Sequence, residues 1–130
     1  MRKIKSIKIL VKDWNDENQE YYDGAIIIND NKIDGIVYYE DVCQRISGFF
    51  DKDESIRLII DNKLTSSSIN CSRISNNNYE GVICNYSNDL KCEIVLKSLK
   101  EIKEVEENKI SCLMYEFENY KSLKLERGIK

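Results

Sequence analysis

The stretch 22–61 constrains the fold most. It holds three of the chain's five glycines inside short runs of β-branched and aromatic residues, at Gly24, Gly35 and Gly48. Polar clusters separate these runs at 29–32 and 51–54. Short apolar runs bounded by such clusters are typical of antiparallel strands. A glycine inside a strand marks a sharp bend or the close approach of another surface, so we expect a strongly coiled sheet.

The same patterning continues along the chain and predicts eight strands. We expect them at about 4–11, 22–29, 33–40, 44–50, 55–61, 64–74, 79–86 and 90–96. Many evenly spaced short strands are typical of an up-and-down antiparallel barrel. The expected fold class is therefore mainly β, a closed or nearly closed barrel of about eight strands. A length of 130 residues suits a single domain with one core.

The pattern changes from strand to helix after the last strand. Ser98 and Glu101 match a capping box, and apolar residues recur at spacings of three and four at Ile110, Leu113, Met114 and Phe117. This predicts a helical segment at about 99–121 with an apolar stripe that lies on the sheet.

The register of two hairpins is inferred from their turns. A turn centred on Asn88 pairs Cys84 with Cys92 and Val82 with Ile94, which places all four on the inward face. For strands 44–50 and 55–61, one turn centre opposes Ile46 with Leu58 and another opposes Phe49 with Ile56. Both alternatives stay open at this point.

The strand rhythm resembles that of a small lipocalin-like (calycin) barrel. The runs that carry the resemblance are Asp34-Gly35-Ile36-Val37-Tyr38-Tyr39, Ile46-Ser47-Gly48-Phe49-Phe50, Ser55-Ile56-Arg57-Leu58-Ile59-Ile60 and Tyr79-Glu80-Gly81. Lipocalins carry a Gly-x-Trp signature, whereas this chain has Lys12-Asp13-Trp14. The resemblance therefore implies the barrel fold rather than a ligand-carrier role.

Composition indicates the cellular compartment and excludes some classes of binding partner. Charged residues make up 33% of the chain with both signs mixed, the net charge is −3, and no apolar run approaches the roughly 20 residues that cross a bilayer. We expect neither nucleic acid nor a membrane as partner. The five cysteines form no C-x-x-C pair and histidine is absent, so we expect reduced thiols, a cytoplasmic protein, no metal site and no cofactor.

The first functional hypothesis is a non-enzymatic barrel that holds a small apolar or amphipathic ligand. The candidate lining residues are Val37, Tyr39, Ile46, Leu58, Val82, Cys84, Cys92 and Ile94, and Arg73 is a candidate for binding a ligand carboxylate. The alternative is that these side chains fill a solid core.

The second hypothesis is a protein-interaction module. Neighbours on a strand point to opposite faces, so the pairs Tyr21-Tyr22 and Tyr38-Tyr39 cannot all face inward. The candidate partner-binding residues are Tyr21, Tyr22 and Tyr38. An uncovered edge strand at 64–74 would offer a second route to association, including self-association.

The loop after the first strand carries two further expectations. Trp14 is expected to plug the core, with stacking on a ligand as the alternative. The acidic residues of the loop, at Asp13, Asp16, Glu17 and Glu20, match no calcium loop and are expected to be solvated. No catalytic residues are predicted.

Overall fold

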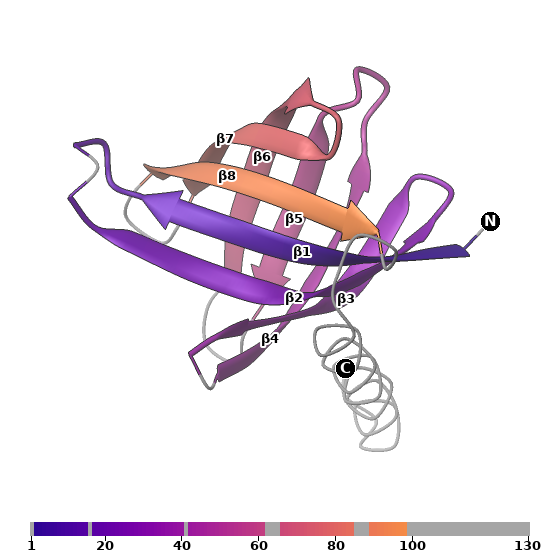
Figure 1. Ribbon diagram of the computed structural model, residues 1–130, viewed down its shortest axis with the longest axis horizontal. Helices are drawn as coiled ribbons and strands as arrows, with labels where there is room; N and C mark the ends of the chain where they lie inside the picture. Colours follow the sequence, from indigo (N-terminus) through magenta and orange to yellow (C-terminus); the bar gives the residue numbers. More distant parts are fainter. Residues whose placement is uncertain (1, 16, 41, 62–65, 85–88, 99–130) are drawn as a thin grey trace.

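The computed structural model describes residues 2–15, 17–40, 42–61, 66–84 and 89–98 (Figure 1). The predicted helical segment at 99–121 lies outside these residues. In the part of the chain that is described, no helix is long and apolar enough to span a membrane.

Eight antiparallel strands form a closed barrel in chain order, with β8 returning to pair with β1 (Figure 1). The predicted fold class is confirmed. The strands are β1 (Arg2–Lys12), β2 (Gln19–Asn29), β3 (Lys32–Tyr39), β4 (Val42–Phe50), β5 (Ile56–Asp61), β6 (Ser66–Ser75), β7 (Asn78–Cys84) and β8 (Asp89–Ser98). Since β6 pairs with both β5 and β7, the expectation of an uncovered edge at 64–74 is wrong.

The core is the inward face of the barrel. Alternate residues of each strand point inward, and β-branched and other aliphatic side chains dominate there. They include Ile7, Ile9, Ile26, Ile33, Ile46, Leu58, Ile69 and Ile94, all of them nearly inaccessible to solvent. The basic start of the chain is one of these strands, with Lys8 exposed between buried Ile7 and Ile9.

An aromatic pair stands near each end of the barrel. The rings of Tyr22 and Tyr39 lie 5.4 Å apart at the end that carries the β1–β2 and β3–β4 connections. The rings of Phe50 and Tyr79 lie 6.1 Å apart at the other end. Tyr22 and Phe50 pack against the aliphatic core, so the aromatic pairs bound the interior at both ends.

Two hairpin registers differ from those expected. In β7–β8, Cys84 pairs with Asp89 and Val82 with Lys91, because four residues rather than a tight turn join the strands. The register is shifted by three positions, and a shift by an odd number of residues moves the side chains of β7 to the opposite face relative to β8. In β4–β5, Ile46 pairs with Ile60, so neither of the two expected registers is observed. The shift from the Ile46–Leu58 register is two residues, so the same side chains face inward as in that register.

Candidate functional site

The predicted lining residues on the inward face fill space rather than border a hollow. Val37, Ile46 and Ile94 have no exposed surface, and Leu58 and Cys92 have 2% and 1%. Side chains around a ligand-sized cavity would keep surface accessible to a water molecule, and these do not. The solid-core alternative therefore describes this layer. Tyr39 lies at the barrel end in the tyrosine pair described above.

Three predicted lining residues lie elsewhere. Val82 and Cys84 are on the outer face of β7, because the register places Gly81 and Ile83 inward instead. Arg73 is exposed beside a β-bulge, and its guanidinium forms an ion pair with Glu54. The prediction that Val82 and Cys84 line the interior is wrong, and the miscounted β7–β8 turn explains it. Arg73 pairs with the inward-facing Tyr79 but lies at the end of the barrel, where it is exposed.

The predicted partner-binding tyrosines do not form one patch. Tyr21 is exposed on the outer face, where the Lys8 ammonium lies 4.7 Å from the centre of its ring. Tyr38 is also on the outer face but is partly buried. Tyr22 faces inward and packs on the core, which corrects its assignment to a partner surface.

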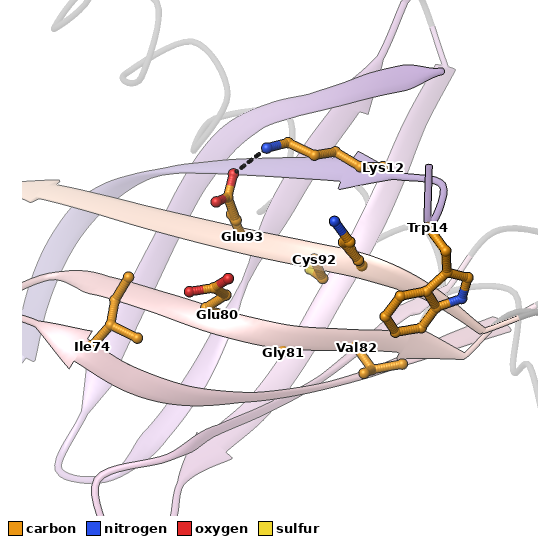
Figure 2. Close-up of a pocket in the computed structure, with 9 residues that line it drawn as sticks. Lys12, Trp14, Ile74, Glu80, Gly81, Val82, Cys92 and Glu93 are labelled. Atoms are coloured by element: carbon orange, nitrogen blue, oxygen red, sulfur yellow. Dashed lines mark ion pairs between the residues drawn. The ribbon is translucent and has the colours of Figure 1, made fainter. Parts of the chain in front are cut away.

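A groove of about 420 Å³ lies on the outside of the barrel across β1, β6, β7 and β8 (Figure 2). Its lining comes from strands at both ends of the chain, brought together by barrel closure, and from the loop that follows β1. The lining residues are Lys12, Trp14, Ile74, Glu80, Gly81, Val82, Lys91, Cys92 and Glu93. Gly81 and Cys92 face inward, so their main chain forms part of the groove floor.

Trp14 forms one end of the groove, and its indole is fixed rather than free. Its Nε1–H donates a 2.7 Å hydrogen bond to the carbonyl oxygen of Asp89 at the start of β8. The side chain is nevertheless 60% exposed, which corrects the expectation of a core plug. A tryptophan with its polar atom paired and its ring accessible is suited to stacking on a ligand.

Asp13 holds the loop that carries Trp14. Its carboxylate accepts hydrogen bonds from the amides of Glu17 (2.8 Å) and Asn18 (3.2 Å), and from the Asn18 side chain (2.8 Å). Partial desolvation raises the pKa of Asp13, but these hydrogen bonds and the charge of Lys91 outweigh it, so the pKa lies below its usual range. The loop is therefore organised by an ionised carboxylate.

Two carboxylates face each other across the groove. Glu80 and Glu93 are directly opposed on β7 and β8, an arrangement that repels. Glu93 pairs with Lys12 at 3.2 Å, as Figure 2 shows. Glu80 is exposed, and no ion pair or hydrogen bond joins its carboxylate to another described residue. The groove thus combines an accessible aromatic ring with one carboxylate, Glu80, that no described side chain pairs, in a lining that also holds Lys12 and Lys91.

The cysteines near the groove offer little reactivity. The Cys71 thiol donates to the carbonyl of Cys92 at 3.8 Å, and both side chains are buried. Hydrogen bonding with Cys71, followed by burial, raises the pKa of Cys92, so its thiol stays protonated at neutral pH. Across the described ranges, no three His, Cys, Asp or Glu side chains are grouped so that they could hold a metal ion.

Sequence reasoning missed most of the groove. The misplaced β7–β8 register hid that Glu80 opposes Glu93. Ligand stacking by Trp14 is the alternative expectation from the sequence, and a core position is the first. The usable signal was a lone tryptophan in a polar loop at a strand end, where little apolar sequence surrounds it.

Comparison with known proteins does not assign a family or a function to this chain. No protein-family model matches the chain, and no curated protein or solved structure is significantly similar to it.

Proposed function

We propose that this protein is a non-enzymatic binding module that takes a small amphipathic ligand in the outer groove rather than in the barrel interior. The observation that carries the proposal is Trp14, held by its hydrogen bond to Asp89 with its ring open to the groove. The groove volume of about 420 Å³ lies within the roughly 300–1,000 Å³ range of small-molecule sites.

Glu80, the groove carboxylate that no described side chain pairs, favours a cationic ligand. An ammonium group near Glu80 would relieve the repulsion between Glu80 and Glu93, while an apolar part would cover Val82 and stack on Trp14. An anion would meet both carboxylates, and Lys12, one of the two groove lysines, is already paired with Glu93. We therefore propose an organic amine with an aromatic or aliphatic body as the ligand class.

The test uses Trp14 as the reporter, because it is the only tryptophan in the chain. Its fluorescence is followed during titration with 3-phenylpropan-1-amine, 3-phenylpropan-1-ol and 3-phenylpropanoate, which differ only in the charged end. We expect the amine to bind about tenfold more tightly than the alcohol, a difference of about 1.4 kcal/mol, and the carboxylate to bind least. Equal affinity for all three would refute the proposed ligand class.

A matched pair of variants tests whether the carboxylate that binds the amine is the one in the groove. Glu80→Gln removes the groove carboxylate and should bring the amine to the affinity of the alcohol. Asp61→Asn removes a carboxylate at the exposed end of β5 and should change nothing. If both variants weaken amine binding equally, the effect comes from the overall charge of the protein and not from the groove.

The rival hypothesis of a protein-interaction module has narrower support. Of the three tyrosines assigned to it, Tyr21 alone is both outward and well exposed, and its ring already contacts Lys8. Trp14 and Ile74 are the most exposed large apolar side chains of the described residues, and both belong to the groove. A protein partner would therefore also be expected to engage the groove, through an exposed basic segment.

A further inference from the structure

An apolar surface also lies on the outer wall of the barrel, at positions where side chains are expected to be exposed to solvent. Ala25 and Ile27 of β2 alternate with the inward residues Ile26 and Ile28, so they point outward, and so does Ile36 of β3, which pairs with Ala25. Ala25, Ile27 and Ile36 form what we call the outer β2–β3 patch. It is on the opposite side of the sheet from the core.

The outer β2–β3 patch is buried although it is outside the core. The exposed fractions are 0% for Ala25, 8% for Ile27 and 2% for Ile36. None of the three belongs to the interior hydrophobic cluster that contains their neighbours Ile26 and Ile28. An outward residue of a barrel strand is buried only when something lies over it.

Arg45 supports the same conclusion from a polar atom. It lies beside Ile36 on the outer face of β4, and its guanidinium pairs with Asp34 at 3.1 Å. Its Nε is nevertheless inaccessible to solvent and has no hydrogen-bond partner. A solvated outer wall would leave that nitrogen in water, whereas the Arg45 side chain as a whole is 30% exposed, so the cover reaches from Ile36 to the Nε of Arg45 and ends there.

The chain supplies a segment of the required chemistry at the required place. Ser98, the last residue of β8, pairs with Lys5 of β1. On the next two strands, Lys5 pairs with Ile26 of β2, and Ile26 pairs with Gly35 of β3. The chain therefore leaves the barrel level with the patch and two to three strands away, about 10–15 Å along the sheet. The residues that follow carry the apolar stripe Ile110, Leu113, Met114 and Phe117.

We propose that residues 99–121 form an amphipathic helix whose apolar stripe packs on the outer β2–β3 patch. A helix of this length spans about 35 Å, enough to cross the patch with one face. The two outer surfaces thus differ in their role: the apolar patch is occupied by the chain itself, and the groove at Trp14 stays open. This inference does not rest on the proposed function of the groove.

The direct test is NMR spectroscopy of the full chain with labelled methyl groups, in which nuclear Overhauser effects report which groups are in contact. We expect contacts between the Phe117 ring and the methyl groups of Ile36 and Ala25. A mixed sample of labelled and unlabelled protein shows whether each contact lies within one molecule. Contacts between two molecules would overturn the proposal in favour of a second copy as the cover, and no contact from 99–121 to the patch would overturn it outright.

Two variants of the same segment provide a matched control. On a helix, Phe117 lies on the apolar stripe, whereas Tyr115 lies on the opposite face. Phe117→Asp should release the segment, shift the methyl resonances of the outer β2–β3 patch and increase binding of a hydrophobic dye. Tyr115→Asp should do neither. Equal effects of the two substitutions, or no effect of either, would contradict packing through this stripe.

Discussion

At the residue scale, glycine controls how closely neighbouring strands approach inside the barrel. A Cβ atom at Gly48 would lie 1.9 Å from the carbonyl oxygen of Arg57 on β5, and one at Gly81 would lie 2.1 Å from that of Asn70 on β6. Both contacts are with main chain, which cannot move aside without shifting a strand. These positions are therefore restricted to glycine by space and not by backbone dihedral angles.

The Gly48→Ala variant tests this restriction. It should lower the free energy of unfolding by about 2 kcal/mol or more, because β4 and β5 must separate to admit the methyl group. Urea denaturation provides the measurement, and Ser47→Ala, one residue away on the outer face, is the control. Unfolding midpoints that are alike for both variants would mean that β4 and β5 tolerate the added methyl.

The ionised carboxylate of Asp13 acts at the same scale and gives a dependence on pH. Its pKa is lowered in the folded state, so its contribution to stability is complete above the unfolded pKa of about 4 and is lost as the pH falls through the folded value. Below about pH 4 we expect the loop to loosen and the fluorescence of Trp14 to change.

Replacing the carboxylate isolates this effect. Asp13→Asn should show altered Trp14 fluorescence already at neutral pH and should lose the acid transition of that signal. An acid transition of the same size in the variant would assign it to other carboxylates, such as Asp53, whose pKa is also lowered, mainly by hydrogen bonds from Ser55.

At the element scale, the β7–β8 hairpin shows what periodicity predicts and what it leaves open. The alternation of apolar and charged residues located both strands. The turn fixes the pairing, and four joining residues give a different register from a turn centred on Asn88. Both Val82 and Ile83 are apolar, so composition did not distinguish the inward one.

A pair of adjacent substitutions tests the observed register. Ile83 is buried on the inward face, whereas Val82 is on the outer face beside the groove. Ile83→Asp should cost at least about 3 kcal/mol, because it buries an unpaired carboxylate, and Val82→Asp should leave the fold intact. Thermal unfolding followed by circular dichroism separates the two. Greater damage from Val82→Asp would restore the register inferred from the tight turn.

At the scale of the whole molecule, barrel closure creates the candidate site. Lys12 and Trp14 are about 80 residues from Lys91 and Glu93 in the sequence, and the pairing of β1 with β8 brings them together. Strand number, strand order and inward residues such as Ile46, Leu58 and Ile94 follow from local patterns, so the sequence predicted them, whereas Val82 was assigned to the wrong face. The groove depends on a loop conformation, a register and closure at once, and no local pattern encodes all three.

Closure also explains why the interior was the natural first candidate for a ligand. A barrel of about eight strands has an interior that side chains either fill or leave open for one small molecule. Ile9, Ile26, Ile46 and Ile94 fill this one, with an aromatic pair near each end. The volume of the individual inward side chains, more than the strand number, decides between the two.

The central claim, that a ligand binds outside the barrel, is tested most directly by methyl resonances of the full chain during titration with 3-phenylpropan-1-amine. We expect the methyl resonances of Val82 and Ile74, at the groove, to shift with ligand concentration while those of Ile46, Leu58 and Ile94 in the interior stay unchanged. Saturable shifts of the interior methyl groups, with those of Val82 and Ile74 fixed, would contradict it and return the ligand to the inside of the barrel.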